Sequence, residues 1–138
     1  MSKRNVTIAR ILMLLYIAAL AYLCFGHFSN LPQISRKFLN IDTDKIVHFI
    51  MFLPFPVLFY FCIGKNPRNA FMALLAVLGI FLAGCLIAAG TEIGQKFIPD
   101  RASDPKDFLA DSIALGLSSL AVFIIMVIKG IKQSRTAK

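Results

Sequence analysis

The sequence predicts an all-α integral membrane protein, a four-helix bundle with both termini in the cytoplasm. Two observations predict the membrane class: 58% of the 138 residues are hydrophobic against 16% charged, and the mean hydropathy is +0.75. A third is the placement of the charges, which leaves uncharged stretches at 11–35, 46–64, 69–91 and 112–128. Each is long enough, or nearly so, to cross a hydrocarbon core of about 30 Å as a helix. Because these spans leave no room for a soluble catalytic domain, any activity belongs to the bilayer or its surface.

The net charge of +8 has a topological explanation. Nine Lys and Arg residues fall in the N-terminal tail and the start of the first span, the 64–69 loop and the C-terminal tail. The two other loops carry six basic residues and all seven acidic ones, so the two faces carry +9 and −1. By the positive-inside rule, both termini are cytoplasmic and the acidic loops face outward. No nucleic-acid-binding motif accompanies the charge, so we expect no nucleic-acid partner.

The first span is predicted at about 8–26, as an anchor that is not cleaved. In the loop that follows, Leu31, Ile34, Phe38 and Ile41 recur at helical spacing. This spacing favours a short amphipathic helix at about 31–41, lying in the outer membrane interface. A loop packed against the bundle is the alternative.

The remaining spans are predicted at about 45–63, 70–96 and 107–128, all within a single domain of residues 1–138. Pro54 and Pro56 should kink the second span near mid-membrane. The third span is rich in Gly and Ala at four-residue spacing, which lets helix backbones approach closely, so we expect it to be the central packing helix. The Asp-Pro pair at 104–105 is a good start for the fourth span.

Polar residues gather at the span ends that face outward. Antiparallel neighbours bring the start of span two, the end of span three and the start of span four to one membrane level. We predict Glu92 and His48 as candidate catalytic residues. The predicted binding residues are Asp44, Lys45, Gln95, Arg101, Asp107 and Asp111.

Each of these side chains also has a structural interpretation. Asp44 and Asp107 sit where helix N-termini favour an anion, and Lys45 and Arg101 can neutralise neighbouring carboxylates or anionic lipid. Glu92 and Asp111 point more strongly to function, because an acidic side chain costs about 2.5–3.5 kcal/mol at the centre of a membrane span, and less near its edge.

The chemistry open to such a cluster is general-base catalysis or the binding of a divalent metal on a phosphate-bearing lipid. The residues do not decide whether a metal is present. The chain contains no HExxH zinc motif, no P-loop and no Gly-x-Ser-x-Gly nucleophile elbow.

Three ordered motifs resemble the VanZ-like family of small bacterial membrane proteins. They are Asp44-Lys45-x-x-His48-Phe49, then Glu92-x-x-Gln95-x-Phe97-x-Pro99-x-Arg101, then Asp107-x3-Asp111 with Gly116 beyond. The similarity covers about residues 42–118 and departs at Asp111, where the family pattern often has Asn. The family takes its name from tolerance to the glycopeptide antibiotic teicoplanin. The resemblance therefore implies a bacterial inner membrane and a cell-envelope function, but it does not supply a mechanism.

Two functions remain open from the sequence. The first is a protein that binds an amphiphile, either a lipoglycopeptide antibiotic or an envelope lipid precursor, at an outward-facing polar cleft and contributes to glycopeptide tolerance. The second is a small intramembrane hydrolase or transferase acting on a lipid-linked phosphate or glycan, with Glu92 or His48 as general base. If the chemistry needs charge, Glu92→Gln should abolish activity in a folded protein. The resemblance to the VanZ-like family, whose pattern often has Asn at this position, implies that Asp111→Asn acts more mildly.

Overall fold

The computed structural model describes residues 2–26, 37–38, 41–67, 69–98 and 104–136 of the chain. These residues are helical except for short connections and one pair of two-residue strands. In chain order the elements are α1 (Lys3–Phe25), β1 (Lys37–Phe38), β2 (Ile41–Asp42), α2 (Thr43–Phe52), α3 (Phe55–Ile63), α4 (Ala70–Gln95) and α5 (Pro105–Thr136).

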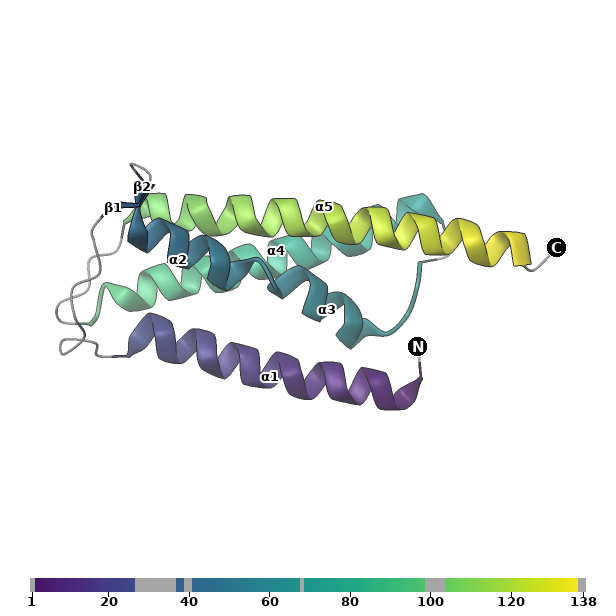
Figure 1. The fold of residues 1–138 in the computed structure, drawn as a ribbon, viewed down its shortest axis with the longest axis horizontal. Helices are drawn as coiled ribbons and strands as arrows, with labels where there is room; N and C mark the ends of the chain where they lie inside the picture. Colours follow the sequence, from purple (N-terminus) through teal and green to yellow (C-terminus); the bar gives the residue numbers. More distant parts are fainter. Residues whose placement is uncertain (1, 27–36, 39–40, 68, 99–103, 137–138) are drawn as a thin grey trace.

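Four segments are long and apolar enough to cross a membrane, which confirms the predicted all-helical membrane class. They are Lys3–Phe25, Thr43–Ile63, Ala70–Gln95 and Pro105–Gly130, with hydropathies between 2.2 and 2.7. Figure 1 shows that α1 begins and α5 ends toward the same end of the bundle. At the opposite end, α2 and α5 begin and α4 ends, so the polar residues of these helix ends share one level.

The second span is broken in the middle, as its prolines predict. Helix α2 ends at Phe52 and α3 begins at Phe55, because Pro54 and Pro56 have no N–H for the carbonyls four residues earlier. The hydroxyl of Tyr16 in α1 donates a hydrogen bond of 2.6 Å to the carbonyl of Met51 beside this break. Helix α1 therefore supplies a polar contact where the second span has lost regular backbone bonds.

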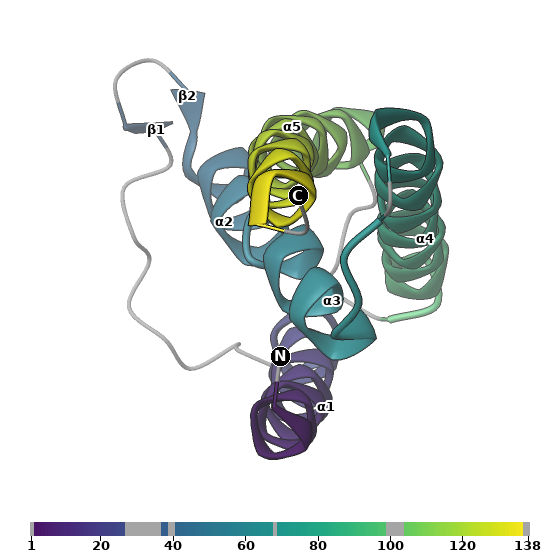
Figure 2. The ribbon, with the colours of Figure 1, turned by 90° about the vertical axis from the view of Figure 1, so that its right-hand side faces the viewer.

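The most enclosed helix is α5, and the prediction that the third span is central is wrong. In the apolar window of α5, 39% of the residues are buried, against 22% in α4. Figure 2 shows α5 between α2 and α4, with α3 below it. The glycines of α4 are used unevenly. A Cβ at Gly84 would lie 2.5 Å from Leu115 Cδ2 and a Cβ at Gly94 would lie 2.7 Å from Phe25 Cε1, while a Cβ at Gly79 or Gly90 would meet nothing within 4 Å.

The end of the predicted amphipathic helix is not helical. Residues Lys37–Phe38 pair with Ile41–Asp42 as antiparallel strands. The physical reason is the backbone conformation at the start of α2. Its N-cap residue Asp42 has extended dihedrals (φ −61°, ψ 129°), so its backbone N–H and C=O can pair with a neighbouring strand. Residues 31–36 and 39–40 of that prediction lie outside the described residues.

Candidate functional site

Three helix ends contribute the polar cluster. Asp44 and His48 lie one turn apart in α2, and Asp107 and Asp111 lie one turn apart in α5. Glu92 comes from the last turn of α4. Residues four apart share a helix face, so each pair points in one direction. Helices α2 and α5 begin at the same end of the bundle, and their packing turns both pairs toward each other.

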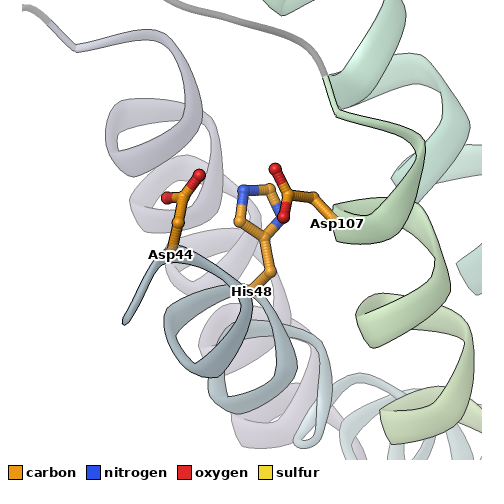
Figure 3. A group of neighbouring side chains, drawn as sticks. All are labelled: Asp44, His48 and Asp107. Carbon is orange, nitrogen blue, oxygen red and sulfur yellow. The ribbon is translucent and has the colours of Figure 1, made fainter. Parts of the chain in front are cut away.

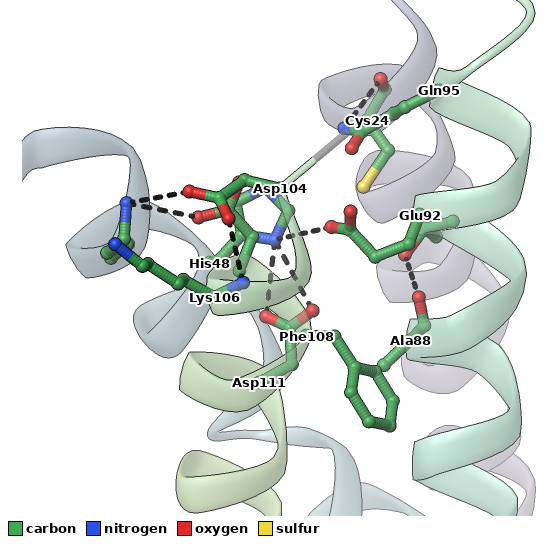
Figure 4. Close-up of polar contacts among 12 residues, drawn as sticks. Cys24, His48, Ala88, Glu92, Gln95, Asp104, Lys106, Phe108 and Asp111 are labelled. Carbon is green, nitrogen blue, oxygen red and sulfur yellow. Dashed lines mark hydrogen bonds and ion pairs between the residues drawn. The ribbon is translucent and has the colours of Figure 1, made fainter. Parts of the chain in front are cut away.

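The centre of the cluster is the imidazole of His48. Its Nδ1 atom lies 3.3 Å from both Asp111 oxygens and 3.9 Å from Glu92 Oε1 (Figure 4). All three residues are buried, with relative exposures of 3% for His48, 0% for Asp111 and 7% for Glu92. A carboxylate this close to Nδ1 accepts a hydrogen bond from its N–H, which in a neutral imidazole leaves the lone pair on Nε2.

The outer part of the cluster is formed by Asp44 and Asp107 on either side of the same imidazole (Figure 3). Asp44 is exposed, whereas Asp107 is only 2% exposed. The Oδ1 atom of Asp107 is buried and has no hydrogen-bond partner, and the same holds for Oδ1 of Asp111. Buried carboxylate oxygens are usually hydrogen-bonded, so each of these atoms calls for an explanation.

A lysine neutralises part of the outer edge. Lys45 Nζ lies 2.8 Å from Asp42 Oδ2, 3.3 Å from Asp104 Oδ2 and 3.8 Å from Asp107 Oδ1. Asp104, directly before α5, also accepts a hydrogen bond of 3.0 Å from the backbone N–H of Lys106. This backbone bond, followed by the contacts with Lys45, lowers the pKa of the Asp104 carboxyl below its ordinary value.

In the described part of the chain, two sets of side chains can hold a metal ion, and they share His48. The outer set is Asp44, His48 and Asp107, and the inner set is His48, Glu92 and Asp111. Within each set, one donor atom from each residue lies within 4.8 Å of the others. Imidazole nitrogen with carboxylate oxygen is a donor combination typical of Zn²⁺ and related divalent ions.

Burying these charged side chains is energetically unfavourable, so packing alone does not account for the cluster. Asp107 and Asp111 are buried, and among the described residues Lys45 is the one lysine that contacts them, at 3.8 Å from Asp107. Burying a charge that is incompletely paired is unfavourable by several kcal/mol. Acidic side chains in membrane spans generally mark ion, proton or substrate sites. The arrangement can carry out proton transfer through Glu92 or the imidazole, and it can bind a cation.

The other predicted site residues are less central. Gln95 Nε2 donates to the Cys24 carbonyl at 3.2 Å, so this side chain ties α4 to α1 and does not join the His48 cluster. Arg101 lies outside the described residues. Sequence reasoning missed Asp42 and Asp104 as partners of Lys45, although the three-residue spacing of Asp42 and Lys45 was a usable signal.

Comparisons of the chain with protein-family models, with curated proteins and with solved structures find no match. The resemblance to the VanZ-like family therefore stays a prediction from three motifs. Two of these motifs begin at Asp44 and Asp107, whose side chains flank one imidazole in the structure.

Proposed function

We propose that this chain is a VanZ-like protein of the bacterial cell envelope that performs acid–base chemistry on a lipid-linked phosphate or glycan. The observation that carries this proposal is the buried contact of His48 Nδ1 with Asp111 at 3.3 Å, beside Glu92 at 3.9 Å. A carboxylate that holds one nitrogen of a histidine fixes its tautomer and orientation, which is a common arrangement around reacting groups. Glu92 is the general base in this proposal, and Asp111 positions His48.

The charge of the cluster favours chemistry over simple binding of an anionic lipid. Four carboxylates, those of Asp44, Glu92, Asp107 and Asp111, face one lysine among the described residues of the cluster. Such a group repels a phosphate headgroup unless a proton or a cation intervenes. Binding an amphiphile without turnover, with glycopeptide tolerance as its consequence, is the competing function that the experiment must separate.

The proposed step for a phosphate ester is hydrolysis. A water oxygen forms a bond to phosphorus while the bond from phosphorus to the lipid oxygen breaks. Glu92 accepts a proton from the water, and its conjugate acid returns that proton to the departing lipid oxygen. In a transferase, an acceptor hydroxyl replaces the water and the proton follows the same route.

The proposed location is the outer side of the bacterial inner membrane. Lys3, Arg4 and Lys129 lie in the helix turns toward the end of the bundle opposite the cluster. Basic residues are retained on the cytoplasmic side of membrane proteins, so this distribution favours an outward-facing site. Lipid-linked envelope precursors are used on that side.

The test is turnover by the purified protein in lipid nanodiscs, with a long-chain isoprenyl phosphate and an isoprenyl-phosphate-linked sugar as probes. Products are identified by mass spectrometry. Glu92→Gln should reduce turnover by about 10²–10⁴-fold, the usual contribution of a general base. In cells, the same variant should lose antibiotic tolerance when its membrane level matches that of the wild type.

The matched control is Lys96→Gln, which changes an exposed residue just after α4 and should leave turnover unchanged. Equal turnover by Glu92→Gln and the wild type would overturn the proposal. So would saturable retention of either probe by the folded wild type without any product, which would assign the protein to the binding class.

A further inference from the structure

The outer set of donors, Asp44, His48 and Asp107, has the composition of a metal site with open positions. It offers two carboxylates and one imidazole, with donor atoms within 4.8 Å of one another. Ligand atoms around a Zn²⁺ ion, each at about 2.0–2.2 Å, are separated by roughly 3.5 Å in a tetrahedron. Small side-chain adjustments therefore suffice to close the set around one ion.

The orientation of His48 matches that of a metal ligand. Histidines that bind a metal through one nitrogen almost always donate the other N–H to a carboxylate or carbonyl. Here Nδ1 faces Asp111 at 3.3 Å, which leaves Nε2 to coordinate. The imidazole lies between Asp44 and Asp107 (Figure 3). An ion bound by His48 could therefore be reached by a carboxylate from α2 and by one from α5.

The Oδ1 atom of Asp107 is a second, independent observation that favours cation binding. The side chain is 3% exposed, and Oδ1 has no hydrogen-bond partner among the residues that the structure describes. Lys45 remains 3.8 Å from this atom, because its ammonium is closer to Asp42 at 2.8 Å and Asp104 at 3.3 Å. A buried carboxylate oxygen without a hydrogen bond is unfavourable, and coordination to a cation would relieve it.

Access distinguishes the two sets of donors. Asp44 is exposed, so the outer set opens toward the end of the bundle, whereas Glu92 and Asp111 of the inner set are both buried. The exposed carboxylate of Asp44 gives the outer set a donor at the protein surface, which the inner set does not have. This leaves Glu92 beside the ion as a base and Asp111 behind His48 as its hydrogen-bond acceptor.

We infer that Asp44, His48 and Asp107 bind a divalent transition-metal ion of the Zn²⁺ class at the polar end of the bundle. Three protein ligands leave a position for water or for a headgroup oxygen, as in catalytic zinc sites. The ion also neutralises carboxylate charge, so a phosphate headgroup can approach. This last consequence rests on the proposed function, while the metal site itself does not.

The experiment titrates Co²⁺, a coloured substitute for Zn²⁺, into the full-length protein after metal removal in detergent. We expect visible absorption that saturates at one ion per chain and is displaced by Zn²⁺. Asp44→Asn and Asp107→Asn should each weaken Co²⁺ binding at least about tenfold, and Asp111→Asn should weaken it by about 10–100-fold through His48. Asp44 is exposed, so its variant tests the site without disturbing the core.

The control is Lys96→Gln, which changes an exposed side chain just after α4 that is not among the donors and should keep wild-type affinity. Glu92→Gln should also keep the Co²⁺ spectrum while losing turnover. The experiment can therefore contradict the proposed metal site without contradicting the proposed acid–base chemistry, and the reverse. A wild type that binds no Co²⁺, or an Asp44→Asn variant that binds like the wild type, would overturn the inference. Loss of the spectrum in Glu92→Gln alone would place the ion in the inner set and also overturn it.

Discussion

The Nδ1 atom of His48 lies 3.3 Å from Oδ2 of Asp111, a residue 63 positions further along the chain. The contact joins the second turn of α2 to the second turn of α5, the most enclosed helix of the bundle. It fixes which nitrogen of the imidazole carries the proton, since a carboxylate can only accept. The packing of α5 therefore determines which face of His48 is presented to a ligand.

Asp111→Asn should lower turnover on the isoprenyl phosphate probe by on the order of 10²-fold. The resemblance to the VanZ-like family implies a milder effect, because that family's pattern often has asparagine at the matching position. The contact with His48 predicts a larger one, since an amide can present an N–H to Nδ1 and favour the wrong tautomer.

The control for this variant is Ser112→Ala, which removes the neighbouring hydroxyl, a donor to the Phe108 carbonyl of its own helix at 2.8 Å. Ser112→Ala should keep wild-type turnover. Asp111→Glu restores the carboxylate and should recover part of the activity. If Asp111→Asn and Ser112→Ala had equal turnover, the positioning role of Asp111 would be wrong.

Gly84→Ala should destabilise the bundle by about 1–3 kcal/mol, the usual cost of overpacking. The new Cβ would lie 2.5 Å from Leu115 Cδ2 and 3.1 Å from Phe55 Cδ1, and both of these side chains are fully buried. Gly79→Ala is the matched control in the same helix, because its Cβ would meet nothing within 4 Å. Thermal unfolding in detergent compares the two, and equal unfolding temperatures would contradict this packing of α4 on α5.

Asp104→Asn should lower the unfolding temperature at neutral pH, and the difference from the wild type should shrink in acid. The pKa of Asp104 is lowered by the backbone N–H of Lys106 and by Lys45. A lowered carboxyl pKa contributes stability that is present above the ordinary value of 3.8 and is lost as the pH falls through the lower folded-state value. Melting curves between neutral pH and pH 3 measure this, and a difference independent of pH would contradict it.

Cysteine labelling from outside the cell should reach a cysteine at Ser103 and not one at Lys65, in a background without the three native cysteines. The reason is the charge distribution, which places the loop before α5 outside and the loop after α3 inside. Labelling after permeabilisation should reach both positions and serves as the control. The reverse pattern would place the cluster on the cytoplasmic side.

The long-range features that topology determines could be predicted from the sequence. Uncharged runs located the four membrane segments, and antiparallel neighbours implied that His48, Glu92 and Asp111 meet at one level. The prolines at 54 and 56 predicted the break in the second span. These predictions succeed because they depend on the length and order of elements and not on the details of side-chain packing.

Packing itself was harder to predict. Small residues in α4 indicate that a close approach is available, but only two of its four glycines, Gly84 and Gly94, lie close to side chains of neighbouring helices. Gln95 shares the helix end with Glu92, yet the rotation of α4 turns its amide toward the Cys24 carbonyl. Such choices follow from how helices rotate against each other, which spacing along one helix does not specify.

The hydrogen bond from Tyr16 to the Met51 carbonyl has a consequence for how the chain is built into the bilayer. Acyl chains offer no hydrogen bonds, so a donor from another helix stabilises a carbonyl beside a proline break. That donor is carried by α1, which leaves the ribosome before the segment that needs it. The nascent second span can therefore complete its polar contacts as soon as it enters beside α1, whereas a chain that begins at residue 43 would bring the Met51 carbonyl into lipid without its tyrosine.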